Sequence, residues 1–311
     1  MKIIVNYVFV IALIACVVFR LTSVEAMLIG AMGSLVLGNP FAGQIRRWTH
    51  HCLAISVVGL GAGMTVASVQ SVGVKGLLLS GLMILVVLVA GAWLARWIQV
   101  GRVQSVLIAV GTAICGGSAI AAVAPVLDAT DQELSVSLGV VFLLNSVALL
   151  CFPYIGHYLG LSQHSFGLWC ALAIHDTSSV LGATSHYGSD ALDIGMAMKL
   201  TRALWIIPVS LGVAAIETRR RQKTAVETPR FPKFILGFVM MVAVATWCPS
   251  IHPVAEIVSG MAHRLIAVTL FLVGASITPA MLRSVHWRSL IFALLIWVGI
   301  STITLIIVIS S

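Results

Sequence analysis

The sequence predicts an all-α polytopic membrane protein with about eleven transmembrane helices. Hydrophobic residues make up 60% of its 311 residues, and charged residues make up only 9%. Soluble domains carry about 25% charged residues, so this composition excludes a soluble globular protein. The apolar residues also recur in long runs along the whole chain, as bilayer-crossing helices require.

The basic residues and the cysteines indicate neither a nucleic-acid partner nor a metal site. The net charge of +8 does not indicate nucleic acid, because the basic residues are confined to short loops, as is typical of cytoplasmic loops. The six cysteines lie singly, without a C-x-x-C pair, so neither a disulfide framework nor a zinc site is predicted. We expect no metal, no cofactor and no nucleic acid, with the lipid bilayer as a partner.

The first six predicted spans have recognisable ends or interiors. The first also resembles a signal peptide, but its 17 residues are long for a signal core, so we favour a span. The second ends at Gly38-Asn39-Pro40, and the fourth ends at Arg96-Trp97, a pair typical of the membrane interface. The third is rich in glycine, which lets helices approach closely in lipid. These runs are 3–19, 26–37, 53–69, 74–98, 103–127 and 134–154.

The remaining spans divide into a hairpin and a C-terminal group. Two runs within Ser165–Pro208 flank a polar turn at Tyr187-Gly188, and the last three runs are 234–247, 261–278 and 290–309. The basic stretch 217–233 separates them and is interpreted as a cytoplasmic connection. We therefore predict one membrane domain over 1–311, with a first part at 27–216, the connection at 217–233 and three last spans at 234–311.

Charge predicts the orientation. If Lys2 is cytoplasmic and the spans alternate, 13 of the 18 Lys and Arg residues lie on the cytoplasmic side. The positive-inside rule then predicts a cytoplasmic N-terminus and a C-terminus on the other side of the membrane, which is the periplasm if the protein lies in a bacterial inner membrane. An ungapped match of Ala54–Leu77 with Ala267–Leu290 relates the third and tenth spans, which have opposite orientations. Such a match favours inverted repeats, as in secondary transporters.

The hairpin brings opposite charges to one depth. Asp176 and Lys199 each lie about 11 to 12 residues from its tip, or about 17 Å along a helix. This depth is near the centre of a hydrocarbon slab about 30 Å thick, where charged residues are costly and usually functional. Lys199 and Arg202 are spaced i, i+3 on one helix face, so Asp176 can neutralise only one of them. An ion pair alone would be structural, but the positive surplus favours an anionic substrate.

Two small-residue stretches are candidates for holding that substrate. Gly111–Ser118 predicts either a broken helix, whose amides at Gly116, Gly117 and Ser118 face a ligand, or close helix packing. Hydroxyls follow the His-Asp pair, and they would either bind substrate or hydrogen-bond to carbonyls of their own helix. The hydroxyl residues are Thr177, Ser178 and Ser179.

An enzyme is the less favoured interpretation. His175 and Asp176 with Cys115 or Ser178 as nucleophile would form a catalytic set only if the helix breaks, because adjacent helical residues point about 100° apart. No G-x-S-x-G, H-E-x-x-H or phosphate-binding loop is present. We therefore predict no catalytic residues.

Three motifs resemble a known family. Gly111–Pro125 (GTAICGGSAIAAVAP), Ala173–Thr177 (AIHDT) and Lys199–Arg202 (KLTR) resemble the YeiH-like family of bacterial inner-membrane proteins, usually labelled sulfate exporters. The resemblance covers the chain from about Leu28 onward. It implies a relative of the inverted-repeat cation/proton antiporters and anion carriers, with a scaffold, a core of crossed and broken helices, and homodimers.

We therefore expect a secondary transporter of a small anion of the sulfate or sulfonate class, coupled to protons. The substrate-binding residues would be Gly116, Gly117, Ser118, Thr177, Ser178, Ser179, Lys199 and Arg202, and the proton-coupling residues His175 and Asp176. The alternative is a cation/proton antiporter in which Asp176 carries the exchanged ion. A membrane-embedded enzyme comes after both.

Overall fold

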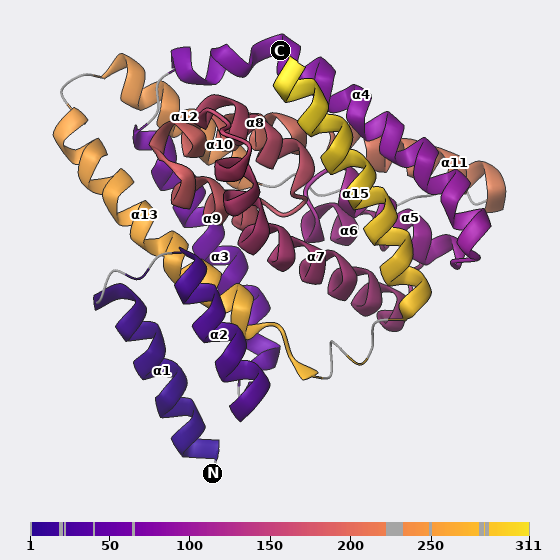
Figure 1. Cartoon of the computed structure of the whole chain (residues 1–311), viewed down its shortest axis with the longest axis horizontal. Coiled ribbons are helices and arrows are strands. Elements are labelled where there is room, and N and C mark those ends of the chain that lie inside the picture. Colours follow the sequence, from indigo (N-terminus) through magenta and orange to yellow (C-terminus); the bar gives the residue numbers. More distant parts are fainter. Residues whose placement is uncertain are drawn as a thin grey trace.

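The computed structural model describes residues 2–18, 21, 23–39, 41–63, 66–221, 233–248, 251–279, 283 and 286–310. This part of the chain is helical and contains no strand (Figure 1). Its first helices are α1 Lys2–Val18, α2 Ser23–Leu37, α3 Ala42–Leu60, η1 Gly61–Gly63, α4 Val66–Ile98, α5 Arg102–Ala113, α6 Gly117–Val123 and α7 Asp131–Tyr158. They are followed by α8 Gln163–Ala173, α9 Thr177–Tyr187, α10 Ser189–Ala203, α11 Ile206–Arg221, α12 Lys233–Trp247, α13 His252–Ala275 and α15 Trp287–Ser310.

The helices form two groups that meet mainly along α9. The first group contains α1, α2, α3, α12 and α13, with α13 packed along both α2 and α3. The second group contains α4, α5, α6, α7, α8, α10, α11 and α15, and α9 contacts members of both groups. Figure 1 shows α1, α2 and α13 on one side, α4, α11 and α15 on the other, and α8, α9 and α10 between them.

A helix lies in every predicted span. Within the described residues, five helical segments are long and apolar enough to cross a membrane: 76–98, 132–158, 189–220, 253–275 and 287–310. Shorter apolar helices lie at 25–37, 102–113 and 236–247. The chain is thus a polytopic helical membrane protein, as predicted, while the count of eleven crossings stays a prediction.

Several boundaries differ from the predicted ones. α3 begins at Ala42, so the basic stretch Arg46–His51, which lies between the predicted spans 26–37 and 53–69, is helical. No Gly or Pro interrupts residues 44–58, and hydropathy marks the part of a helix suited to lipid, not its ends. α13 likewise begins at His252, nine residues before the predicted start of the tenth span. α11 continues to Arg221, into the predicted connection, and residues 222–232 lie outside the described residues.

The two segments matched in the sequence also behave alike in the fold. α3 gives way to the 3₁₀ turn η1 at Gly61, and α13 ends at Ala275, directly after Gly274. The sequence match aligns Gly61 with Gly274, so α3 and α13 end within two positions of each other in the match. α3 and α13 also pack along each other. The internal repeat and its inversion both stay predictions.

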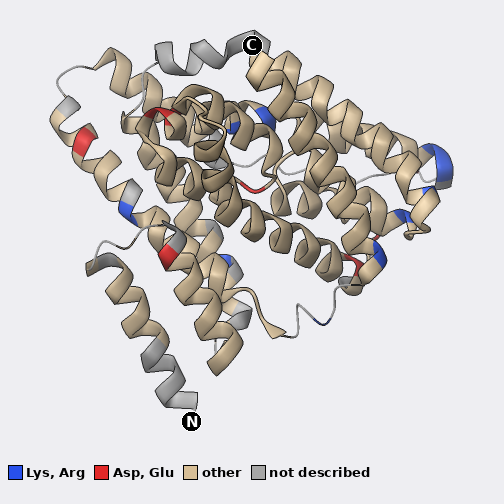
Figure 2. Cartoon of the chain, in the orientation of Figure 1, with Lys and Arg blue, Asp and Glu red and all other residues tan. Residues whose placement is uncertain are grey.

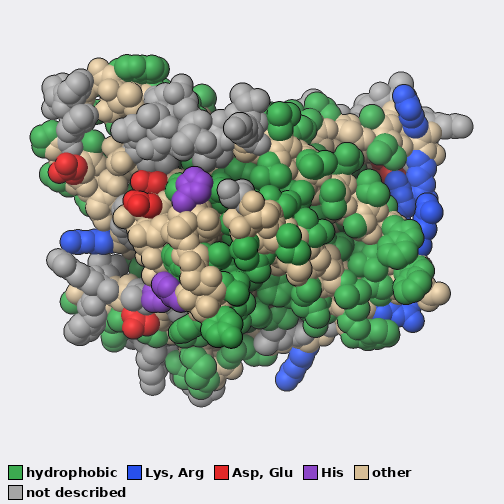
Figure 3. Space-filling model, turned by 45° about the horizontal axis from the view of Figure 1, so that its top comes forward, with side chains coloured by type: hydrophobic (Ala, Val, Ile, Leu, Met, Phe, Trp, Pro, Cys, Tyr) green, Lys and Arg blue, Asp and Glu red, His purple; other side chains and the backbone are tan. Residues whose placement is uncertain are grey.

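Lys and Arg gather at one end of the molecule, where α11 ends and α5 begins (Figure 2). Arg102 at the start of α5 donates a hydrogen bond to Glu217 of α11 at 2.5 Å, and Glu217 is only 3% exposed. The space-filling view shows most of the blue side chains at one edge of a largely hydrophobic face (Figure 3). One-sided basic residues are what the positive-inside rule requires, although the side itself stays a prediction.

Candidate functional site

Two helical segments are interrupted. α5 ends at Ala113 and α6 begins at Gly117, while α8 ends at Ala173 and α9 begins at Thr177. Gly116 makes the first interruption, with φ +66° and ψ −123°, a conformation that residues with a Cβ rarely adopt. The structure therefore shows the broken helix that was one interpretation of the glycine-rich stretch.

Close packing, the other interpretation, also holds within this stretch. A Cβ on Gly111 would lie 2.7 Å from the Ile120 side chain, and one on Gly117 would lie 2.9 Å from the Phe142 ring. Glycine here therefore serves both the break in the helix and the approach of its neighbours.

The two interruptions lie against each other. A Cβ on Gly116 would be 3.4 Å from Cα of Asp176. Lys199 of α10 joins both breaks, because its Nζ donates hydrogen bonds to the carbonyl oxygens of Ile114 at 3.1 Å and Ile174 at 2.7 Å. We call this region the crossing, defined as residues 112–118 and 171–179 together with Lys199 and Arg202.

Arg202 joins the ends of α5 and α8. Its Nε donates to the Ala113 carbonyl at 2.7 Å, and a terminal nitrogen donates to the Thr112 carbonyl at 3.1 Å. The other terminal nitrogen donates to the carbonyls of Ala171 at 3.1 Å and Leu172 at 2.5 Å. The last carbonyls of a helix have no partner within the helix and carry partial negative charge. One guanidinium thus satisfies the ends of two half-helices at once.

Neither cation is paired with a carboxylate in the crossing. Lys199 and Arg202 are both 0% exposed, and no ion pair joins either of them to Asp176. Their partners in the described part of the chain are backbone carbonyls, which carry no formal charge. The crossing therefore contains two basic side chains and one acidic side chain.

The crossing is also the place where two half-helices begin. Asp176 caps α9: its carboxylate accepts hydrogen bonds from the Ser179 amide at 3.1 Å and from the hydroxyl of Ser178. Asn145 of α7 supports the same break, because its Oδ1 accepts from the amides of His175 at 3.0 Å and Asp176 at 3.3 Å. The first amides of α6 and α9 carry the partial positive charge of a helix start.

All ten predicted site residues lie at the crossing, but they differ in accessibility. Ser118 is exposed, and Gly117 and Asp176 are partly exposed. The other seven are buried: Gly116, His175, Thr177, Ser178, Ser179, Lys199 and Arg202. Arg264, a further basic residue in a predicted span, lies away from them with an exposed side chain on α13.

Some buried polar atoms of this region have no hydrogen-bond partner in the described part of the chain. These atoms are the two ring nitrogens of His175, Oγ1 of Thr112 and Nδ2 of Asn145. Native proteins pair nearly all buried polar atoms, so unpaired ones mark a place where a ligand, a proton or water is expected. Thr112 and Asn145 were not among the predicted site residues. The available signal was a single Asn inside the apolar run 134–154.

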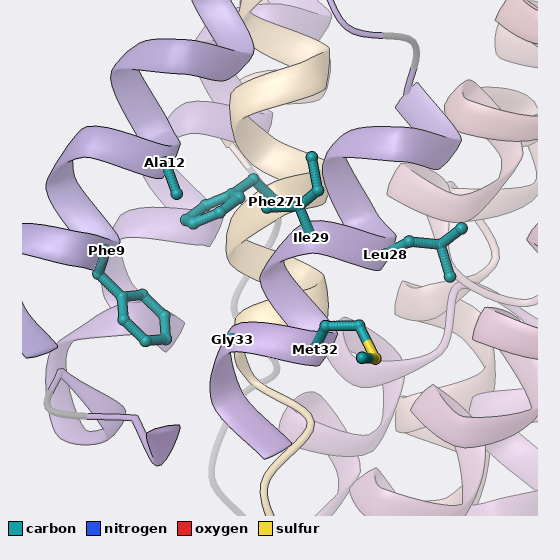
Figure 4. A pocket seen from close by; sticks show the side chains of 7 residues that line it. All are labelled: Phe9, Ala12, Leu28, Ile29, Met32, Gly33 and Phe271. Carbon is teal, nitrogen blue, oxygen red and sulfur yellow. The ribbon is translucent and has the colours of Figure 1, made fainter. Parts of the chain in front are cut away.

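A separate pocket of about 360 Å³ lies between α1, α2 and α13 (Figure 4). Its lining is entirely apolar: Phe9, Ala12, Leu28, Ile29, Met32, Gly33 and Phe271. It offers no donor or charge to an anion, so we do not assign the substrate to it. Among the described residues, no group of three or more His, Cys, Asp or Glu is placed to hold a metal ion.

Comparison with known proteins gives a family and no substrate. A family model described as "Conserved hypothetical protein 698" matches residues 3–293. A UPF0324 membrane protein of Bdellovibrio bacteriovorus is 44% identical over 298 residues, covering 96% of this chain and 92% of the relative. One from Geobacter sulfurreducens is 43% identical, covering 96% of this chain and 94% of the relative. No solved structure matches.

Proposed function

We propose that this chain is a secondary transporter of a small anion. The chain belongs to the Conserved hypothetical protein 698 family and is similar to UPF0324 membrane proteins of bacteria. The supporting observation is the excess of basic over acidic side chains at the crossing. Lys199 and Arg202 are buried there with Asp176 as the one acidic side chain. An unpaired cation at the centre of a bilayer costs about 2.5 to 3.5 kcal/mol on insertion scales, and a bound anion would offset that cost.

The contacts at the crossing assign different roles to the predicted residues. Four of the five N–H donors of Arg202, and two of the three of Lys199, already serve backbone carbonyls. We propose that the positive charge of Lys199 and Arg202 attracts the substrate, while other groups form most of the direct hydrogen bonds to it. The direct donors would be backbone amides at the starts of α6 and α9, in 117–118 and 177–178. The Gly116 amide already donates to the Gly111 carbonyl, and the Ser179 amide and the Ser178 hydroxyl already donate to Asp176. Oxyanions such as sulfate and sulfonates suit several converging donors.

Proton coupling would act through Asp176 and His175. Asp176 lies at the accessible side of the crossing, where its negative charge opposes entry of an anion. Protonating Asp176 or His175 would raise the net positive charge of the crossing and favour anion binding. Transport of the anion together with a proton follows as the proposed mechanism.

The alternative is a cation/proton antiporter, and the accessible carboxylate of Asp176 is the observation that favours it. Heat-unfolding midpoints of the purified protein in detergent distinguish the two. We expect choline sulfate and choline methanesulfonate to raise the midpoint relative to choline gluconate at equal ionic strength. A ligand at 100 times its Kd stabilises by about 2.7 kcal/mol. Stabilisation that follows Na⁺ or Li⁺, whatever the anion, would support the antiporter instead.

Transport is tested in proteoliposomes with radiolabelled sulfate and an imposed pH gradient. Ser118→Glu places a negative charge at the accessible start of α6, so we expect it to reduce sulfate flux strongly. Ser189→Glu makes the same change at the exposed start of α10, outside the crossing, and should leave the flux near wild type. Equal effects of the two substitutions would remove the crossing from the transport path.

A further inference from the structure

Asn145 of α7 contacts the break between α8 and α9. Its side chain is 1% exposed, and one oxygen, Oδ1, accepts the amides of both His175 and Asp176. The backbone amides of these two residues have no acceptor within a helix, because the residues lie between Ala173, where α8 ends, and Thr177, where α9 begins. Asn145 therefore holds the conformation of the break from a neighbouring helix.

This contact fixes which way the amide group faces. Backbone N–H groups are donors, so the carbonyl oxygen of Asn145 must face them and the NH₂ group must lie on the other side of the same planar group. That nitrogen, Nδ2, is buried and has no hydrogen-bond partner among the described residues. A buried donor left unpaired is costly, and the crossing has no described protein acceptor in reach of it.

We infer that Nδ2 of Asn145 donates a hydrogen bond to an oxygen of the bound anion, so that α7 contributes to the substrate site. The inference rests on the proposed function and adds a specificity-determining residue to it. The free group of Asn145 is a donor, which matches an oxyanion. A cation would need the oxygen, which two backbone amides already share. Asn145 therefore favours an anion over a cation at this site.

Two substitutions separate the roles of the oxygen and the nitrogen. Asn145→Asp keeps an acceptor for the two backbone amides and removes the NH₂ donor, whereas Asn145→Leu removes both. Hydrogen exchange without ligand should show the amides of residues 175 and 176 protected in wild type and Asn145→Asp, but faster in Asn145→Leu. This measurement does not depend on any substrate. Unchanged exchange in Asn145→Leu would overturn the role of the oxygen.

Asn39→Asp is the matched control. Asn39 also uses both ends of its amide group, since Nδ2 donates to the Ala275 carbonyl and Oδ1 accepts from the Phe41 amide, but it lies outside the crossing. We expect Asn39→Asp to lower the unfolding temperature and to leave the affinity for anions unchanged. Loss of anion affinity in this control would mean that destabilisation alone weakens binding.

Calorimetric titration with sulfate and with methanesulfonate tests the nitrogen. We expect Asn145→Asp to weaken binding of both ligands about tenfold or more, as loss of a hydrogen bond to a charged group does. The new carboxylate also repels anions, and that repulsion alone would change ln Kd twice as much for the dianion as for the monoanion. A loss in that two-to-one ratio, or unchanged affinity, would overturn the contact. Absence of anion binding in wild type would instead overturn the proposed function, while the exchange result would still stand.

Discussion

At the scale of single residues, Arg202 is the side chain on which the crossing depends most. It is 0% exposed and donates to four carbonyls at the ends of α5 and α8. These carbonyls would otherwise be buried without partners, at a cost of about 1 to 3 kcal/mol each. A guanidinium suits the task because its fork carries five donors in one plane, whereas an ammonium has three donors at one point.

We therefore predict that Arg202→Ala lowers the free energy of unfolding by about 3 to 5 kcal/mol, as breaking a buried charged network does. Arg202→Lys keeps the charge but reaches fewer carbonyls, so its loss should be smaller. Thermal unfolding in detergent measures both. Arg219→Ala, at an exposed position of α11, is the control and should change stability by about 0.5 kcal/mol or less. An Arg202→Ala protein as stable as this control would contradict the assigned role.

Asp176 combines a structural and a proposed chemical role, and one substitution separates them. Asn is as good a helix cap as Asp, so Asp176→Asn should keep the hydrogen bond from the Ser179 amide and the start of α9. It cannot take up a proton, however. We expect a folded protein whose sulfate uptake into proteoliposomes no longer responds to a pH gradient. Normal proton-driven uptake by this variant would exclude Asp176 from coupling.

At the scale of elements, α2 and α13 are the most closely packed helix pair of the first group. A Cβ on Gly30 would overlap the carbonyl oxygen of Phe271, and one on Gly274 would overlap that of Met27. The two clashes mirror each other, with Met27 and Gly30 of α2 facing Gly274 and Phe271 of α13. Such contact between backbones is how helices gain packing energy in lipid, where apolar area alone gives little.

We predict that Gly30→Ala and Gly274→Ala each destabilise the protein by about 1 to 3 kcal/mol, because the helices must separate to admit a methyl group. Gly260→Ala is the matched control on α13, since nothing lies within 4 Å of a Cβ there. It should be neutral or slightly stabilising, because alanine favours helix more than glycine does. Unfolding temperatures in detergent give the comparison, and equal values for Gly274→Ala and Gly260→Ala would refute the close contact.

At the scale of the whole molecule, the basic residues define one end. α5 begins and α11 ends there, joined by the hydrogen bond from Arg102 to the buried Glu217. Exposed Arg219 and Arg220 lie in the last turn of α11, next to this contact in the chain. The predicted connection 217–233 starts at the same end. The positive-inside rule assigns this end to the cytoplasm.

Reporter fusions test that orientation. A reporter fused after Arg221 should lie in the cytoplasm. Reporters fused after Asp131 or Ser311 should lie in the periplasm, because an odd number of spans separates each of these positions from Arg221. Alkaline phosphatase and green fluorescent protein give opposite readouts at each position. A cytoplasmic reporter at Ser311 would refute the count of eleven spans.

The sequence by itself determined the class of the protein and pointed to residues that meet at the crossing. Long apolar runs require helices in a bilayer, since every backbone polar group must be paired within its own segment. The turn at Gly188 then brought α9 and α10 together as predicted, and with them Asp176 and Lys199. Charged residues inside apolar runs were recognisable because their cost in lipid makes them rare.

Only the tertiary structure decided what these charges contact. The partners of Arg202 are backbone carbonyls as far as 90 positions away, and every residue has such a carbonyl, so no sequence pattern identifies them. The same holds for Asn145, which is visible as a polar residue in an apolar run but whose partners are two backbone amides about 30 positions away. The sequence identifies each side chain and its chemistry. The backbone groups that a side chain contacts depend on where a helix breaks and on which other helix crosses it there.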